Sequence, residues 1–233
     1  MYSTPVEITL RADALYGARE QIENVRASVE LLRVAATQNK YEAAWRLGRA
    51  LFFLGQEART AEEARAFHAE GAEASGRAAR AEPVRVEGHF WLGVNLALEA
   101  RLVNPLKALP LALRARRELE RAASIDPAYH AAGPLRVLAR LESRLPGLLG
   151  GGTKRARTHF QRAVEIAPAN TVTRLYFAEL LLEAGDPDQA RTHLEAILQA
   201  PPDPAWAFEI ERDRRLARQM LQEGKGKRGK ENG

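Results

Sequence analysis

The feature that most constrains this chain is an internal repeat near its carboxyl end. The segment Ala-Arg-Thr-His-Phe at residues 156–160 recurs as Ala-Arg-Thr-His-Leu at residues 190–194, an offset of 34 residues. This is the length of one tetratricopeptide unit, in which a pair of antiparallel helices stacks on the next pair. Pro168 and Pro202 follow at matching positions. Because proline cannot continue a helix, each proline closes its unit.

Weaker copies upstream extend the repeat. Each has a small residue, then core residues at helical spacing, then a proline, as in Ala115, Leu119, Ala122 and Pro127, and in Gly71, Ser75, Ala78 and Pro83. Ala, Leu, Arg and Glu dominate the chain, and all four favour helices. We therefore predict an all-α fold: a tetratricopeptide-like superhelix of about four divergent helix pairs, with capping helices at both ends.

Glycines indicate where the helices of these pairs approach each other. Gly48 and Gly93 lie within predicted first helices, where glycine costs about 1 kcal/mol relative to alanine. They are therefore expected to permit close packing of the second helix. Gly55 and Gly185 follow seven residues after small residues of first helices and are predicted to be turn glycines.

The two ends of the chain read as caps around a single domain, residues 1–223. Residues 6–37 have helical apolar spacing and predict a leading helix, and residues 204–221 predict a closing helix. Residues 224–233 are rich in Gly and Lys and predict a disordered basic tail. We expect this tail to solubilise the chain; a weak anchor for anionic lipid or nucleic acid is the alternative, and no nucleic-acid partner is expected.

The spacing between helices is enlarged in the first three pairs, which predicts longer helices or inserted loops. Prolines at 105 and 110 mark one insertion, and the Pro/Gly-rich segment at 145–152 marks another. Insertions on one side of a helical stack are where such proteins build pockets and partner surfaces.

The sequence offers no catalytic or metal-binding constellation, so we expect a binding protein and not an enzyme, with no cofactor and no metal. The chain has no cysteine, and its five histidines lack metal-ligand spacing. The Gly-x-Gly-x-x-Gly at 224–229 follows no strand, and the Gly-rich segment at 147–154 ends in Gly-Thr-Lys. Neither pattern has the context of a nucleotide-binding loop.

The predicted inner face of the stack suggests a ligand groove. Four positions of each first helix face inward, and the candidates are Trp45, Arg49, Phe52, Phe90, Val94, Arg136, Arg140, Leu175 and Glu179. An apolar groove with fixed cations suits an amphipathic anion such as a fatty acid. We expect the chain of the ligand to contact Trp45, Phe52, Phe90 and Leu175, and its head to contact Arg49, Arg136 and Arg140. In the alternative, longer helices close over this face and make it ordinary core.

Several blocks of the sequence resemble one family. They are Gly-His-Phe-Trp-Leu-Gly-Val-Asn at 88–95, Asn-Pro-Leu-Lys-Ala-Leu at 104–109, Ile-Asp-Pro-Ala-Tyr at 125–129, Gly-Pro-Leu-Arg-Val-Leu at 133–138, and Leu-Pro-Gly at 145–147 with three glycines at 150–152. Together they are similar to the T component (TatT) of tripartite ATP-independent periplasmic (TRAP) transporters, and more distantly to the regulator of microtubule dynamics family.

The resemblance implies a periplasmic or cell-envelope helical lipoprotein that partners a substrate-binding protein. It also implies a cavity for a lipid or other hydrophobic ligand, and possible self-association into a homo-oligomer. A cytoplasmic location is the alternative, because residues 1–10 lack the pattern of a signal peptide and no lipid-attachment Cys is present. The rival function is a general tetratricopeptide scaffold for protein–protein interaction, with no small-molecule ligand.

Overall fold

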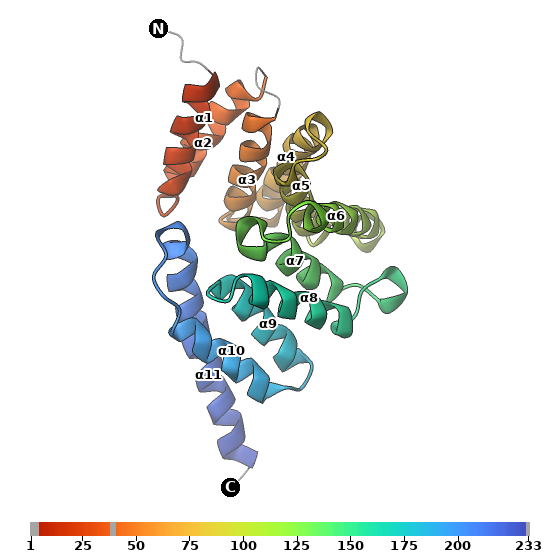
Figure 1. The fold of residues 1–233 in the computed structure, drawn as a ribbon, viewed down its shortest axis with the longest axis vertical. Coiled ribbons are helices and arrows are strands. Elements are labelled where there is room, and N and C mark those ends of the chain that lie inside the picture. The colour runs from red at the N-terminus through yellow and green to blue at the C-terminus, as the bar shows by residue number, and fades with distance from the viewer. Residues whose placement is uncertain (1–4, 38–40, 232–233) are drawn as a thin grey trace. The chain divides into compact units, whose positions relative to one another are not determined.

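In the computed structural model, residues 5–37 and 41–231 are described, and their side chains from residue 6 to residue 223 apart from 38–40. This part of the chain is helical and contains no strand (Figure 1). The helices are α1 (Pro5–Gly17), α2 (Ile22–Ala35), α3 (Glu42–Gln56), α4 (Ala61–Ala81), α5 (Val86–Ala100), α6 (Pro105–Ile125), α7 (Tyr129–Glu142), α8 (Thr153–Ile166), α9 (Thr171–Glu183), α10 (Pro187–Leu198) and α11 (Ala207–Glu231), with short 3-10 turns η1 (Gly147–Leu149) and η2 (Pro204–Trp206).

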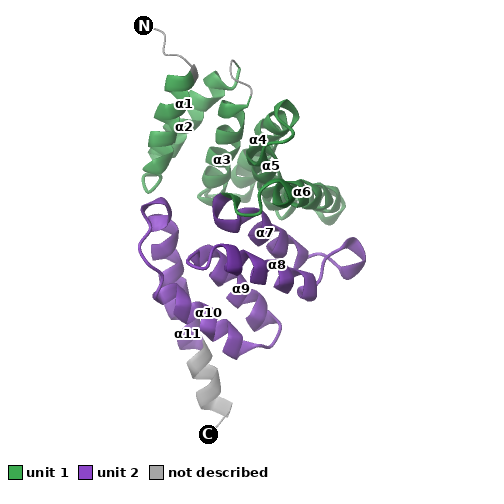
Figure 2. Cartoon of the chain, viewed as in Figure 1, with its two compact units in different colours: residues 1–129 green, residues 130–233 purple. Residues whose placement is uncertain are grey.

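The chain forms two compact units, residues 1–129 and residues 130–233 (Figure 2). The helix pairs α3–α4, α5–α6, α7–α8 and α9–α10 are the four predicted repeats, so the all-α tetratricopeptide-like fold is confirmed. The single domain proposed for residues 1–223 stays a prediction. The predicted disordered tail, 224–233, lies outside the residues whose side chains are described, and it too stays a prediction. Among the described residues, no helix is long and apolar enough to cross a membrane.

The predicted leading helix is wrong in one respect, because residues 6–37 form two helices. α1 ends at Gly17 and α2 begins at Ile22. The turn between them is stabilised by the side chain of Asn24, whose amide nitrogen donates to the carbonyl oxygen of Ala18 at 3.0 Å. Apolar periodicity continues across such a turn, so it could not separate one long helix from a pair.

The glycines of unit 1 allow its helices to touch. A Cβ added at Gly48 would overlap Ser75 Oγ of α4, and one added at Gly93 would lie 2.6 Å from Leu119 Cγ of α6. The predicted close packing at both positions is confirmed. Gly55 is not the predicted turn glycine, because it lies inside α3, where an added Cβ would overlap the ring of His68. Gly185 has a φ of 77° and does form a turn.

A polar cluster is buried in the middle of unit 1. His68 of α4 is only 1% exposed, and its Nδ1 lies 3.2 Å from Asn95 Oδ1. The Asn95 amide nitrogen donates to the carbonyl oxygens of Gly48 at 3.0 Å and Trp91 at 2.9 Å. One asparagine thus joins α3, α4 and α5, and the bond to His68 requires a proton on Nδ1.

This cluster predicts that unit 1 loses stability in mild acid. Burial lowers the pKa of His68 below its ordinary value, with a smaller contribution from the charge of Arg101. In the unfolded chain the pKa returns to about 6.5, so the unfolded state binds the extra proton more readily. The contribution of neutral, buried His68 to the free energy of unfolding is complete above about pH 6.5 and is lost as the pH falls below that value. We expect the urea midpoint to drop between about pH 7.5 and about pH 5.5, and to drop less in His68→Gln. Equal drops would contradict the assignment.

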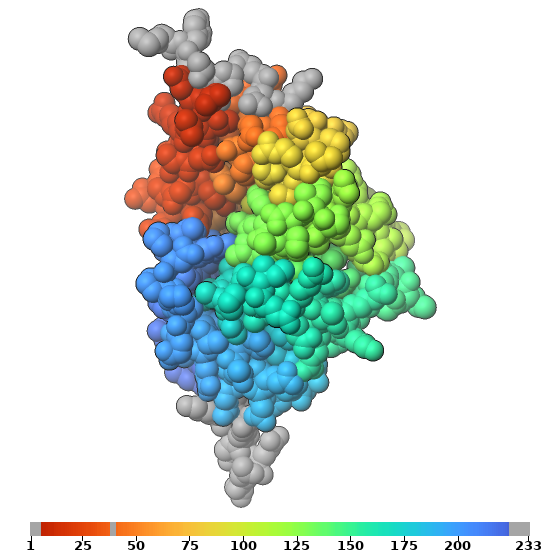
Figure 3. All heavy atoms as spheres, viewed as in Figure 1, coloured from red at the N-terminus to blue at the C-terminus, as the bar shows by residue number. Residues whose placement is uncertain are grey.

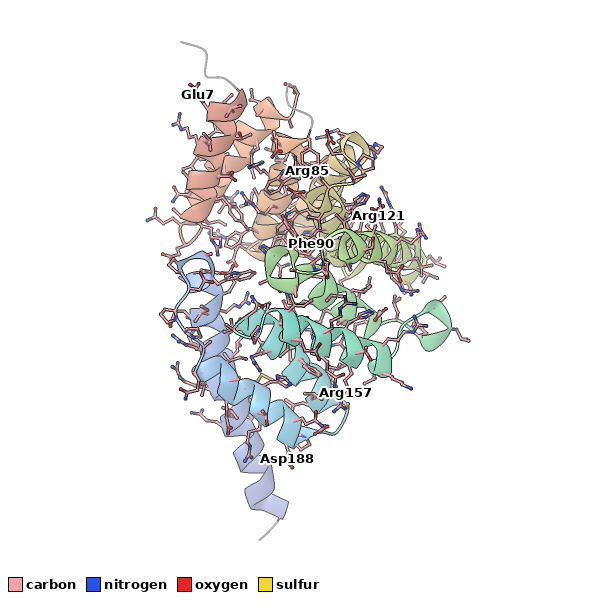
Figure 4. The ribbon with its side chains drawn as sticks, viewed as in Figure 1. Glu7, Arg85, Phe90, Arg121, Arg157 and Asp188 are labelled. Atoms are coloured by element: carbon pink, nitrogen blue, oxygen red, sulfur yellow. The ribbon has the colours of Figure 1, made fainter. Side chains whose placement is uncertain are left out.

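Unit 2 has an aromatic and aliphatic core. Phe160 of α8 stacks on Phe177 of α9 with ring centroids 5.4 Å apart. Around them pack the buried residues Ala139, Ala156, Leu175, Leu180, Leu181, Ala190, Leu194, Ile197 and Ala217. Arg157 of α8 reaches the start of α10, where its Nη2 donates to Asp186 and Gln189 (Figure 4).

Candidate functional site

The predicted ligand-contacting residues of α3 lie against the N-terminal helix of unit 1. Arg49 Nη2 is 2.5 Å from Asp13 Oδ1 of α1, and its guanidinium lies over the rings of Tyr16 at 4.1 Å and Trp45 at 5.2 Å. Arg46 pairs with the other oxygen of Asp13 at 2.8 Å. Arg49, which was predicted to hold an anionic head group, therefore already has a carboxylate partner within its own unit.

The predicted aromatic contacts belong to a cluster in the interior of unit 1. Phe90 is 1% exposed and Val94 is buried, whereas Phe52 is partly buried. The Phe52 ring lies 5.5 Å from Trp91, and the Phe90 ring, labelled in Figure 4, lies 5.3 Å from Tyr129. Trp91 Nε1 donates to Tyr129 Oη at 3.2 Å. Burial raises the pKa of Tyr129 to about 12, so it stays protonated at neutral pH.

Three of the predicted ligand-contacting residues of unit 2 are a buried leucine, Leu175, and an ion pair, Arg140 with Glu179. Leu175 packs in the aromatic core with Phe160 and Phe177. Arg140 Nη1 is 2.5 Å from Glu179 Oε2, and the two side chains are each 30% exposed. The guanidinium of Arg140 also lies 4.6 Å from the ring of Tyr176. Arg140 and Glu179 therefore neutralise one another at the surface.

Arg136 differs from the other predicted arginines because it is buried and has no carboxylate partner among the described residues. It is 4% exposed. Its hydrogen bonds go to neutral oxygens: Nη1 donates to the Ala131 carbonyl at 2.9 Å and to Thr173 Oγ1 at 3.3 Å. Burial lowers its pKa to about 10, while the more distant carboxylates of Asp213 and Glu209 act in the opposite direction. It remains a cation at neutral pH.

The backbone that receives Arg136 is strained. His130, Ala131 and Ala132 have φ values of 51°, 53° and 58°, a turn of left-handed conformation without any glycine. This conformation costs roughly 1–2 kcal/mol per residue. It directs the carbonyls of His130 and Ala131 toward the guanidinium of Arg136, at 3.5 and 2.9 Å. Strain of this kind persists where surrounding contacts enforce it, and it is concentrated at functional sites.

A pocket of about 390 Å³ lies beside this arginine within unit 2. Its walls come from the α8–α9 turn, the proline-rich segment before α11 and the start of α11: Ala131, Ala167, Pro168, Ala169, Asn170, Thr171, Pro201, Pro202, Asp203, Pro204, Trp206 and Ile210. Two wall residues contact Arg136, since Asn170 Oδ1 lies 3.4 Å from its Nη1 and the Trp206 ring lies 5.7 Å from the guanidinium carbon. Arg136 is thus a fixed positive charge immediately behind the pocket wall.

One wall residue keeps a donor for a ligand. Asn170 Oδ1 accepts from the backbone nitrogen and the hydroxyl of Thr173, at 2.9 and 3.0 Å, as well as from Arg136. These bonds orient the side chain so that its oxygen is occupied, while its amide nitrogen donates to no partner among the described residues. Thr171 beside it is fixed by its own bond, because its hydroxyl donates to the buried carboxylate of Asp213 at 2.7 Å.

Sequence reasoning found Arg136 but missed the pocket. The sequence pattern places Trp206 in a closing helix, and no local signal marks Asn170. The run Pro-Pro-Asp-Pro at 201–204 was the available signal, because such a segment is rigid and cannot continue a helix. Among the described residues, no group of three or more His, Asp or Glu side chains is placed to hold a metal ion.

The chain was compared with protein families and with solved structures, and both comparisons found similar proteins. The model of the family described as TRAP transporter T-component matches residues 25–225. No curated protein matches the chain. A thermophilic tetratricopeptide protein of Thermus thermophilus has a similar structure, with a TM-score of 0.71, 18% identity, and coverage of 94% of this chain and 100% of the other. MamA is similar at a TM-score of 0.51 and 12% identity, covering 85% of this chain and 95% of its own. At these identities the two structures support the fold alone.

Proposed function

Because the chain belongs to the TRAP transporter T-component family, we propose that it is a non-catalytic accessory protein of a TRAP transporter. In this role it works at the periplasmic side or in the cell envelope, holds an amphipathic anion and docks a substrate-binding protein. The observation that carries the ligand proposal is the pocket of unit 2 beside a buried arginine whose hydrogen bonds, in the described part of the chain, go to neutral oxygens.

The pocket has the composition that an amphipathic ligand needs. Its volume of about 390 Å³ falls in the usual range for small-molecule sites. Prolines, Trp206 and Ile210 supply apolar surface for a hydrocarbon chain. The amide of Asn170 and the charge of Arg136, which contacts it, favour a carboxylate beside Asn170. The carboxylate of Asp203, another wall residue, disfavours an anion close to it, and we propose that the ligand head lies beside Asn170 instead.

Two of the three arginines predicted to bind the ligand head are already paired with carboxylates. Arg49 and Arg140 each have an acidic partner in their own unit, so an anion would have to displace Asp13 or Glu179 to bind them. Within the described part of the chain Arg136 has only neutral partners, so a carboxylate near it adds an attraction without breaking an ion pair seen there. We therefore propose Arg136 as the principal cation for the ligand head.

Filling the pocket is expected to abolish ligand binding without unfolding the protein. Ala169 lies on the wall and is exposed, so Ala169→Phe can place its ring in the pocket at small cost to folding. We expect titration calorimetry with dodecanoate to show binding by the parent protein and affinity weakened about tenfold or more in this variant. Ala184→Phe is the matched control, because Ala184 is exposed at the other end of α9 and does not line the pocket. A protein that ignores dodecanoate and carries no ligand in native mass spectrometry would refute the ligand proposal.

The docking proposal is tested separately. The transporter's substrate-binding protein, mixed with this chain, is expected to co-elute with it in size-exclusion chromatography. Ala169→Phe should leave this complex intact if the pocket serves only the small ligand. Loss of the complex in that variant, with no dodecanoate binding by the parent protein, would instead favour the rival function, a scaffold that holds a partner peptide in the same pocket.

A further inference from the structure

The loop between α7 and α8 has an uncharged, apolar tip. Residues 145–153 read Leu-Pro-Gly-Leu-Leu-Gly-Gly-Gly-Thr, with no charged side chain in a protein that is 28% charged. Leu148, at the centre of η1, is 102% exposed, the highest value among the exposed large apolar residues described. In Figure 3 this part of the chain projects at the right edge of the view. Moving a fully exposed leucine out of water would be favourable.

The shape of this loop is preformed. Gly150 and Gly152 have φ values of 81° and 110°, which other residues rarely adopt. At Gly151 an added Cβ would overlap the carbonyl of Leu145, so the two ends of the loop are in contact. The tip is therefore a closed turn that already has a defined conformation before any binding.

Four N–H groups in the second half of the loop are hydrogen-bonded to carbonyls of the loop or of the end of α7. The nitrogens of Leu149 and Gly151 donate to the Pro146 carbonyl at 2.9 and 3.1 Å, and that of Gly150 donates to the Gly147 carbonyl at 3.0 Å. Gly152 donates to the Glu142 carbonyl at 2.8 Å, and Pro146 has no backbone N–H. Backbone groups that already have a partner cost less to move out of water than unpaired groups do.

Basic side chains stand at the base of the tip. Lys154 and Arg155 occupy the first turn of α8, are exposed, and form no ion pair among the described residues. Arg144, on the other side of the loop, pairs with Glu183 at 2.9 Å. Cations in the first turn oppose the helix dipole, so the stability of α8 does not explain Lys154 and Arg155.

From these observations we propose that the 145–152 loop is a membrane-contact site, which inserts Leu148 into an anionic lipid surface while Lys154 and Arg155 bind head-group phosphates. A lipid surface suits the tip better than a protein partner does. Its side chains are only Leu, Pro and Gly, so it offers no polar group for specific recognition. A convex apolar tip with a basic base needs no complementary pocket in a bilayer. This inference is independent of the pocket and of the proposed ligand.

The absence of cysteine makes the test direct. Leu148→Cys, labelled with an environment-sensitive fluorophore, would be mixed with vesicles of phosphatidylcholine alone or with added phosphatidylglycerol. We expect a blue shift, and quenching by brominated lipid, only with the anionic vesicles. The matched control is Leu106→Cys, because Leu106 is 90% exposed on α6 and should stay in water. No shift at position 148, or an equal shift at position 106, overturns the proposal.

Unlabelled variants give the size of the effect. We expect Leu148→Ser to weaken binding to anionic vesicles roughly tenfold and Leu106→Ser to leave it unchanged. Lys154→Glu combined with Arg155→Glu should weaken it by at least about tenfold. Circular dichroism checks that the variants fold. Sedimentation with vesicles while the probe at position 148 stays aqueous would assign binding to the basic tail and overturn the proposal. A shift produced by the substrate-binding protein but not by vesicles would overturn it in favour of a protein contact.

Discussion

Replacing Gly88 by alanine is expected to destabilise unit 1 by roughly 1–3 kcal/mol. A Cβ at this position would lie 2.5 Å from the backbone nitrogen of Ala79, 2.8 Å from its Cα and 3.0 Å from the Ala78 carbonyl carbon. These are backbone atoms of α4, which cannot rotate away as a side chain can. α5 must therefore move away from α4, and the contacts on either side loosen. The better helix propensity of alanine, about 1 kcal/mol, offsets only part of this cost.

Gly76→Ala is the matched control for Gly88→Ala. Gly76 lies inside α4 and is also buried, but the nearest atom to an added Cβ is the end of the Arg80 side chain at 3.4 Å. We expect this variant to be unchanged or more stable by about 0.5–1 kcal/mol. Urea unfolding followed by circular dichroism compares the two. Similar urea midpoints for both variants would contradict this prediction, because they would show that α5 can move away from α4 at little cost in free energy.

Phe160→Ala is expected to cost unit 2 about 3–5 kcal/mol. The Phe160 side chain is fully buried and stacks on Phe177 between α8 and α9, so its removal leaves a cavity bounded by rigid helices. Ile166→Ala on the same helix is the control, because Ile166 is 36% exposed and should cost much less. Chemical unfolding measures both. A cost for Phe160→Ala no larger than that for Ile166→Ala would contradict the assignment of Phe160 to the core.

The two variants together address the domain organisation. The predicted single domain, residues 1–223, requires that Gly88→Ala and Phe160→Ala lower one shared unfolding transition. If the compact units 1–129 and 130–233 unfold separately, each variant will lower one of two transitions and leave the other in place. The result also decides whether ligand binding in the pocket of unit 2 stabilises the whole chain or only that unit.

The sequence alone determined the fold, because the repeat imposes it. An offset of 34 residues, small residues at the contacts and closing prolines leave few structures other than stacked helix pairs. The glycines at 48 and 93 marked close packing for the same reason. Single residues were less informative where the same residue type is found in two kinds of structure. Gly55 is equally compatible with a turn and with a helix packed on a histidine, and only the position of His68 decides between them.

Only the tertiary structure decided which of the predicted cations have an acidic partner among the described residues. Arg49, Arg136 and Arg140 look alike in the sequence, since each lies on a first helix at an inward position. Asp13 lies 36 positions before Arg49, and Glu179 comes from a different repeat than Arg140, so neither ion pair could be inferred from local spacing. The pocket beside Arg136 likewise requires the 201–204 prolines, Trp206 and Asn170 to meet from separate elements. The repeat pattern predicts how the helices of each unit pack, because the packing residues recur at fixed positions. A site built from the turns between repeats depends on long-range contacts, which do not recur in the sequence and so cannot be predicted from its periodicity.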